Sequence, residues 1–290
     1  MIRANRGSSV LAVSMSSMLL LSGCLSSPDA NSDERPLINF VPNVAMLDEA
    51  TETVHEPLDV YGPDLRGRQM LERASDLLTE DCVHRAGHAL TLVNVLDYPP
   101  SSRWTVNYFG PWTKERASRT GLDRPYDALS EAHQKEADIP PETTSALGEC
   151  RDSARSDERN NFAERSPSES IYERGQSETW AWASHDPIWE KALGDLQGCM
   201  TAQGYTFDAS RGPTAPVIAE APNSEVGIRA ALDEVECLSS TGAAQTFVDV
   251  VAAYQVAFIA ANEAALVADK KDTDERIALA QKVISEHGGH

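Results

Sequence analysis

The sequence predicts a mostly α-helical fold: a disulfide-stapled helical bundle with a long C-terminal helix and an irregular aromatic segment. Three observations support this prediction. Apolar residues recur at three-and-four spacing in several stretches, which is the period of a helix. Four cysteines beyond the N-terminal region can staple helices together. The final stretch, residues 243–286, carries an apolar stripe that includes Phe247, Val251 and Tyr254, as expected of a helix facing a core.

The N-terminus has the three parts of a secretory signal peptide. Arg3 and Arg6 give a basic start, an apolar run follows from Val10 to Leu21, and small residues come next. A membrane-spanning helix needs about 20 apolar residues, so this run is too short to remain as an anchor. The run ends in Leu21-Ser22-Gly23-Cys24, which resembles the lipobox of bacterial lipoproteins. The alternative is an ordinary signal peptide with a chance cysteine.

The lipobox implies cleavage before Cys24 and lipid modification of that cysteine, and two acyl chains are what stable anchoring takes. Residues 25–45 are polar and broken by prolines, as expected of a linker. We therefore expect a signal peptide at residues 1–23, a flexible tether at 24–50 and a helical extracytoplasmic domain at 51–290, with a sub-division near 165–180. The protein would lie at the outer face of the bacterial cell membrane, held by its lipid.

The net charge of −20 argues against a nucleic-acid partner and against an anionic membrane surface, because both are bound through Lys and Arg. It argues equally against direct attachment to anionic wall polymers. Solubility is the simpler explanation for so acidic a chain.

The other four cysteines are Cys82, Cys150, Cys199 and Cys237. An even number in an exported chain indicates a disulfide framework with three possible pairings. We expect the sequential pairs, Cys82–Cys150 and Cys199–Cys237. Closing loops of about 70 and about 40 residues would each stabilise the fold by roughly 4 kcal/mol. Four free buried thiols are the alternative.

A glycine stands five residues after each of three cysteines, which places each of these cysteines in the last turn of a helix. These glycines are Gly87, Gly204 and Gly242. Asp186-Pro187 marks a helix start. The helices we expect cover residues 66–90, 126–136, 144–162, 186–199, 224–239 and 243–286. Residues 96–125 should form turns around a short extended piece, and residues 163–180 a polar loop with at most a short helix. Asp272-Thr273-Asp274 is a candidate break in the last helix.

Two sets of aromatic residues and two pairs of histidines are candidates for binding. Trp104, Tyr108, Phe109 and Trp112 form a dense aromatic cluster, which is either a ligand-facing platform for glycans or core packing, the commoner role of large aromatics. Trp180, Trp182 and Trp189 pose the same choice. His84 and His88 have a spacing that can hold zinc, but the metalloprotease motif needs a glutamate between them, and Gly87 places His88 beyond the helix. His287 and His290 lie in a tail that we expect to fray. We therefore expect no metal and no cofactor.

Several short elements together resemble a group of uncharacterised lipoproteins and secreted proteins from actinobacteria. These elements are the lipobox, Tyr108-Phe109-Gly110, Gly148-Glu149-Cys150, the CMxxxGY element Cys199–Tyr205 and the VxCxxxTG element Val235–Gly242. The C-terminal half matches best, from about Asp186 onward. The first cysteine is followed by Val83, where such relatives usually have methionine. The resemblance implies an envelope protein of unknown role and supplies no catalytic residues.

No serine elbow, phosphate-binding glycine loop, dinucleotide fingerprint or EF-hand loop occurs in the sequence. We therefore expect a non-catalytic cell-envelope lipoprotein, an accessory or binding module that engages a protein partner or a small ligand outside the membrane. Its long C-terminal helix is a natural docking surface. The alternatives are a ligand receptor for a transporter, with its site between helices, and a cell-wall hydrolase whose carboxylates the sequence does not single out.

Overall fold

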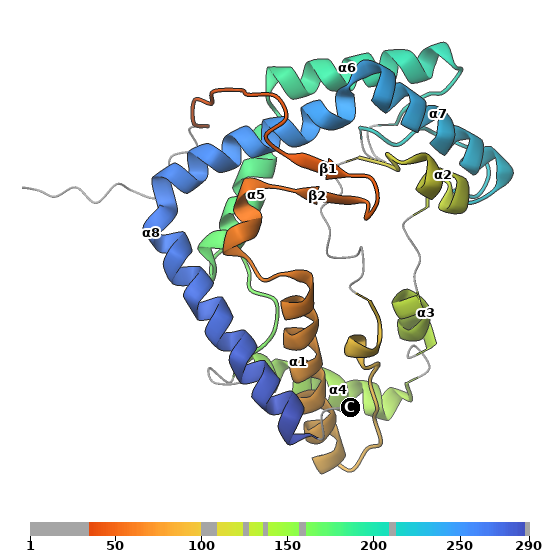
Figure 1. Ribbon diagram of the computed structural model, residues 1–290. Helices are drawn as coiled ribbons and strands as arrows, with labels where there is room; N and C mark the ends of the chain where they lie inside the picture. Colours follow the sequence, from red (N-terminus) through yellow and green to blue (C-terminus); the bar gives the residue numbers. More distant parts are fainter. Residues whose placement is uncertain are drawn as a thin grey trace, which may run out of the picture. The chain divides into compact units, whose positions relative to one another are not determined.

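The computed structural model describes residues 35–99, 109–123, 128–135, 139–156, 161–208 and 213–287. Its elements all belong to a compact unit that begins at Pro36. They are mostly helical, as predicted (Figure 1). In chain order the elements are β1 (Met46–Asp48), β2 (Thr53–His55), the 3-10 helix η1 (Pro57–Tyr61), α1 (Leu65–Arg85), the 3-10 helix η2 (Val95–Asp97), α2 (Lys114–Thr120), α3 (Ala128–Lys135), α4 (Pro141–Ser156), α5 (Ile171–Ala183), α6 (Pro187–Ala202), α7 (Glu225–Thr241) and α8 (Ala243–Glu286).

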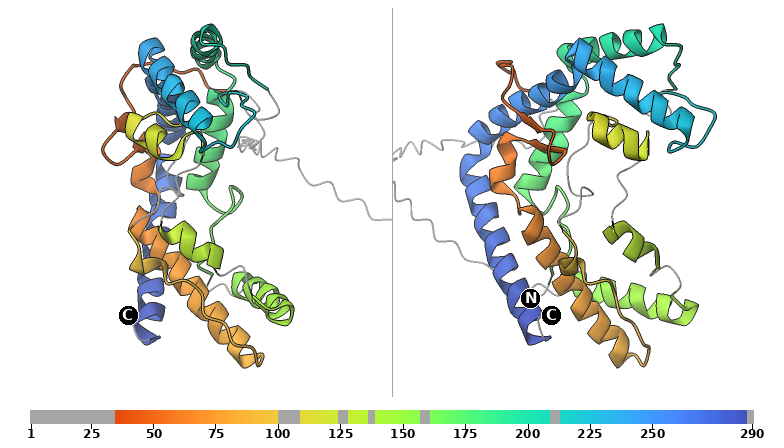
Figure 2. Two further views of the ribbon diagram at one scale, coloured as in Figure 1. Left: turned by 90° about the vertical axis from the view of Figure 1, so that its right-hand side faces the viewer. Right: turned by 45° about the vertical axis from the view of Figure 1, so that its right-hand side comes forward.

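The long helix α8 contacts α6, α7, η1, α5 and α1 at successive points along its length. Figure 2 shows, in two further views, that α5 and α1 lie alongside α8. The predicted apolar stripe is buried, with Phe247, Val250 and Val251 fully covered. The first half of α8 is therefore a core helix, and its apolar face is not free for docking. By length and composition α8 could also cross a membrane, and 44% of its most apolar stretch is buried. A core helix meets the same criterion.

Apolar side chains gather in several clusters along α8. The largest packs α6 and α7 against its first half and includes Trp189, Leu196 and Phe247. A second cluster joins α1 to the end of α8 through Leu71 and Val283. The fold thus depends on one long helix that gives each neighbour its own apolar partner.

Polar side chains on α8 hold segments that lie far away in the sequence. The Asp249 carboxylate accepts hydrogen bonds from the backbone N–H groups of Asn43, Val44 and Ala45 at 2.7, 2.8 and 3.1 Å. The Tyr254 hydroxyl donates to Asp186, which caps the start of α6, at 2.7 Å. Both carboxylates and the Tyr254 side chain are buried, so each bond offsets a desolvation cost.

The predicted tether was too long. We expected residues 24–50 to be flexible, but Ala45 is buried and β1 pairs in antiparallel register with β2, Leu47 opposite Val54. The partner that holds this segment is Asp249, about 200 residues later, so its local composition gave no sign of it. Cys24 and the expected signal peptide lie outside the described residues.

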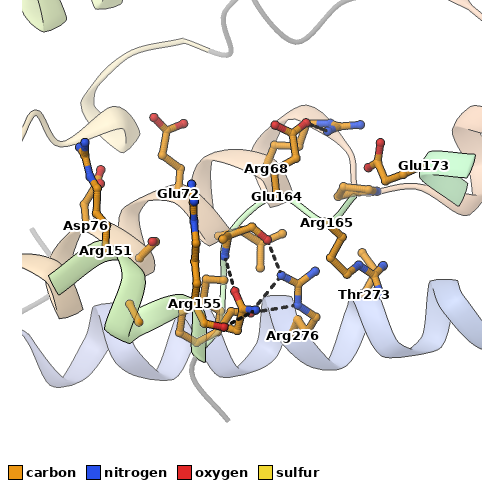
Figure 3. Close-up of a pocket in the computed structure, with 17 residues that line it drawn as sticks. Arg68, Glu72, Asp76, Arg151, Arg155, Glu164, Arg165, Glu173, Thr273 and Arg276 are labelled. Atoms are coloured by element: carbon orange, nitrogen blue, oxygen red, sulfur yellow. Dashed lines mark hydrogen bonds and ion pairs between the residues drawn. The ribbon is translucent and has the colours of Figure 1, made fainter. Parts of the chain in front are cut away.

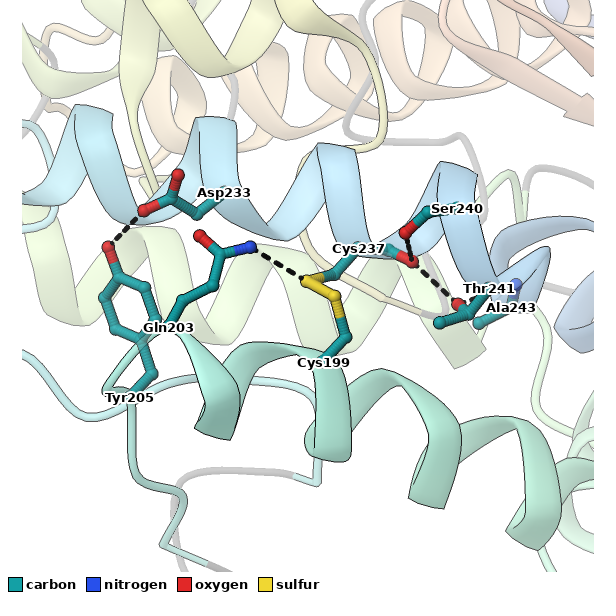
Figure 4. The surroundings of a disulfide bond; sticks show 8 residues. All are labelled: Cys199, Gln203, Tyr205, Asp233, Cys237, Ser240, Thr241 and Ala243. Carbon is teal, nitrogen blue, oxygen red and sulfur yellow. Dashed lines mark hydrogen bonds between the residues drawn. A yellow bond between two sulfur atoms is a disulfide. The ribbon is translucent and has the colours of Figure 1, made fainter.

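The two predicted disulfides are present. Cys82–Cys150 joins α1 to α4, and Cys199–Cys237 joins α6 to α7, each with a Cα–Cα distance of 5.7 Å. Figure 4 shows the second bond, whose sulfur accepts a 3.3 Å hydrogen bond from Gln203. The three predicted glycines all follow these helices with positive φ, between 69° and 94°. That backbone conformation favours glycine and ends a helix.

Three local predictions were wrong. Residues 163–180 were expected to be a loop with at most a short helix, but α5 spans Ile171–Ala183: Ser170 caps its start, and Asp269 accepts the Ser170 hydroxyl and the Tyr172 N–H. The described part of 96–125 contains α2, capped by the Thr113 hydroxyl, and no strand. The helix α8 continues through Asp272–Asp274. There Arg165 donates to Asp272 and Thr273, and Lys270 pairs with Asp274.

Candidate ligand-binding site

A cavity of about 270 Å³ lies between α1, α4, the segment that precedes α5, and α8 (Figure 3). Charged side chains dominate its lining. The lining residues are Pro63, Arg68, Leu71, Glu72, Ser75, Asp76, Arg151, Ala154, Arg155, Asn161, Phe162, Ala163, Glu164, Arg165, Glu173, Thr273 and Arg276.

Two of the cavity's arginines are fixed by α8 and the segment 161–165. Arg165 Nη1 lies 2.8 Å from both Asp269 Oδ1 and Asp272 Oδ2, and its Nη2 donates to Thr273 at 2.7 Å. Arg276 points from α8 and donates to the carbonyls of Asn161 and Ala163, both within 3.0 Å of its Nη2. These bonds dock the segment 161–165 on α8 and so build one wall of the cavity.

Arg68 on α1 contacts both α5 and the segment that precedes α5. Arg68 Nη2 donates to the Tyr172 hydroxyl at 3.2 Å, and its Nη1 lies 3.8 Å from Glu164. Burial raises the pKa of the Glu173 carboxyl above its ordinary value, while the Arg68 guanidinium acts in the opposite direction. Glu173 thus stands at the cavity with a weakened tendency to ionise.

The remaining two arginines belong to α4. Arg151 and Arg155 are four residues apart, so they share one face of the helix, and both are exposed. Figure 3 shows both side chains extended from α4 at the cavity. Within the described structure neither guanidinium has a hydrogen bond or an ion pair. They are the donors that the protein leaves available.

Sequence reasoning missed this cavity, although one signal was visible. In a chain with 25 basic and 45 acidic residues, four arginines fall between positions 151 and 165. The same stretch holds four acidic residues, so the signal was the density of arginines and not a positive net charge. The cavity could not be recognised from this stretch alone, because its other walls come from α1, earlier in the sequence, and from α8, later in the sequence.

The predicted aromatic candidates divide into two groups. Trp104 and Tyr108 lie outside the described residues. Trp112 is partly buried and packs against the largest cluster, and the ring centroid of Phe109 lies 5.7 Å from that of Phe247. The ring of Trp189 is buried, with its centroid 4.3 Å from that of Phe247 and 5.1 Å from that of Trp180. Wherever they are described, these side chains contribute to core packing.

The histidine candidates lie apart from the cavity. The His84 ring Nε2 is 2.7 Å from the Leu90 carbonyl, so this ring is engaged with the backbone. No group of three metal-ligating residues occurs in the described part of the chain. His287 is described and does not fray, because its Nε2 lies 2.8 Å from Asp81 on α1. His290 falls outside the described ranges.

A second buried charged group lies between α2 and α7. Glu234 is 1% exposed, and neither of its carboxyl oxygens has a hydrogen-bond partner of good geometry in the described structure. Burial raises its pKa to about 8, although the Arg116 guanidinium and the nearby Gly110 backbone oppose this shift. Burial likewise lowers the pKa of Arg116. Neither residue lines the cavity, so this pair is separate from the candidate site.

Comparisons of the chain with family models, with curated proteins and with solved structures find no match. The candidate site therefore has to be interpreted from its own geometry.

Proposed function

We propose that this protein is a lipid-anchored binding module of the bacterial cell envelope, held outside the membrane through Cys24, and that it binds a ligand and does not transform it. One observation carries the proposal. The cavity has two walls, α1 and α4, that are joined directly by the Cys82–Cys150 disulfide.

The disulfide supports both halves of this proposal. Disulfides persist in oxidising compartments, which fits an exported chain. A covalent bond between the two walls also keeps the arginines of α4 beside α1, and a site held rigid in advance loses less entropy on binding. Arg165 and Arg276 fix the segment 161–165 on α8, so the cavity wall that this segment forms is also held in place.

The anchor is tested by following the full chain in a bacterial host fed an alkyne-bearing palmitate. We expect labelled protein in the membrane fraction, and no label after Cys24→Ala. The matched control is Ser26→Ala, which changes a neighbouring residue of similar size and leaves the lipobox cysteine in place. Label that survives Cys24→Ala would contradict the lipid anchor.

The binding role is tested with the full chain purified in mild detergent. We incubate it with low-molecular-mass envelope extract, separate bound from free molecules by gel filtration, and identify the bound ones by mass spectrometry. Ser75→Phe places a ring in the cavity and should abolish retention. Ser118→Phe, at an exposed position on α2, should retain the ligand. No retained molecule, or equal retention by both variants, would count against the proposal.

A further inference from the structure

We infer that the cavity between α1, α4 and α8 takes a small anionic ligand, a carboxylate or phosphate joined to an apolar group, and that Arg151 and Arg155 bind its oxyanion. This inference rests on the proposed binding function and names the chemical class of the ligand.

The local charge supports an anion. Five arginines and four acidic residues line the cavity, and one of these arginines, Arg165, is already neutralised by Asp269 and Asp272. The positive charge that has no partner in the described structure is that of Arg151 and Arg155, so an anion would bind there.

The available donors support an oxyanion in particular. A guanidinium presents its N–H groups in a fork that matches a carboxylate or a phosphate. Arg68, Arg165 and Arg276 already donate hydrogen bonds to groups of the protein. Arg151 and Arg155 are unpaired within the described structure and lie on one helix face, so a single oxyanion can bridge them.

The size and lining of the cavity limit the rest of the ligand. Ligand pockets commonly measure about 300–1,000 Å³, so a cavity of about 270 Å³ suits a small molecule. Phe162, buried against Leu71, supplies an apolar part of the cavity wall. An apolar group next to the oxyanion would contact this wall.

The Cys82–Cys150 bond makes the two arginines part of a fixed site. Among the described elements, α4 packs chiefly against α1. Arg151 directly follows the bonded cysteine. The disulfide therefore sets the distance between the arginine face of α4 and the opposite wall.

The test is calorimetric titration of the full chain in mild detergent with four probes. Phenyl phosphate and phenylacetate carry the two oxyanions, benzyl alcohol is a neutral analogue, and benzylammonium is a cationic one. We expect both anions to bind and to weaken as salt is raised. Arg151→Ala and Arg155→Ala should each reduce affinity about tenfold, and the double variant about a hundredfold.

The matched control is Arg229→Ala, which removes an exposed arginine from α7 and should leave affinity unchanged. All these positions are exposed, so the variants should fold, and equal thermal midpoints would verify this. Anion binding that survives the double variant overturns the assignment of these arginines. Binding of benzylammonium in place of the anions overturns the ligand class while leaving the binding function intact. If no probe binds, but the extract experiment captures a ligand that Ser75→Phe excludes, only the anionic class has failed.

Discussion

The carboxyl group of Glu234 lies so close to Gly110 that a Cβ on this glycine would come within 2.5 Å of Oε1. Because Gly110 has no side chain, the segment that leads into α2 can pack directly against the buried Glu234 carboxyl on α7. Because the acid has no hydrogen-bond partner of good geometry in the described residues, its ionisation must cost the fold free energy.

Glu234→Gln should remove a pH dependence of stability. The pKa of Glu234 rises from 4.5 to about 8 on folding, so its neutral form is favoured in the folded state. The contribution of Glu234 to the free energy of unfolding is therefore complete below about pH 4.5 and is lost progressively as the pH rises to about 8. A pKa difference of one corresponds to about 1.4 kcal/mol, so the loss is on the order of 5 kcal/mol. Urea unfolding at pH values on both sides of this window should give a flatter stability profile for the variant than for the parent protein.

The control for that profile is Glu236→Gln, which changes an exposed carboxyl on the same helix and should keep the parent's pH dependence. Parallel profiles for the parent protein and Glu234→Gln would show that the buried acid is not the titrating group.

Asp249→Ala should release the segment that precedes β1. The three backbone N–H groups that donate to this carboxylate would lose their partner, and we expect destabilisation of about 3 kcal/mol. Limited proteolysis should then cut within residues 36–48 while the helices remain intact. Asp274→Ala, which removes an exposed i,i+4 pair from α8, should change stability by about 0.5 kcal/mol or less. Equal protection of residues 36–48 in both variants would refute the anchoring role.

Removing the Cys82–Cys150 bond with a double serine substitution should loosen α4 locally. The bond spans 68 residues and should contribute about 4 kcal/mol. Hydrogen exchange measured by mass spectrometry should accelerate in α4 and stay slow in α6 and α7. The matched double substitution at Cys199 and Cys237, which spans 38 residues, should show the opposite pattern. Faster exchange throughout the chain in both variants would mean that the bonds do not act on separate regions.

Asp81→Asn should lower the pKa of His287. The hydrogen bond to Asp81, and next the one to the Val283 carbonyl, raise that pKa above its ordinary value. A histidine with a raised folded pKa stabilises the fold at pH below its unfolded value and loses this contribution as the pH rises through the folded value. The end of α8 should therefore loosen as the solution becomes alkaline. NMR titration of the His287 ring gives the midpoint, and an unchanged midpoint in the variant would contradict this account.

The sequence predicted the elements whose signals are local. Asp186 and Pro187 mark the start of α6, and Gly242 marks the turn between α7 and α8, because caps act within a few residues. Helix ends placed three of the four cysteines, and the sequential pairing, one of three possible, is the one that the structure has.

The remaining features depend on distant residues. Nothing in the composition of residues 36–48 indicates that Asp249 will hold them. The start of α5 has a local cap in Ser170, but Asp269, almost 100 residues later, also holds it. The cavity takes its walls from four parts of the chain, so no single stretch contains its pattern. The arginines of α4 were visible in the sequence, but the site they form was not.

Because α8 follows its partner segments in the sequence, it also constrains the order in which contacts can form during synthesis. Asp249, Gln255, Asp269 and Arg276 are made well after the segments that they hold. Until the ribosome has made them, the N-terminal segment, η1 and the start of α5 lack the partners that order them. Only contacts among earlier elements, such as α1 with α4, can form during translation. The contacts of α1 with α4 and of α6 with α7 can therefore form before α8 is made, whereas the contacts that join these helix pairs to α8 must form after it.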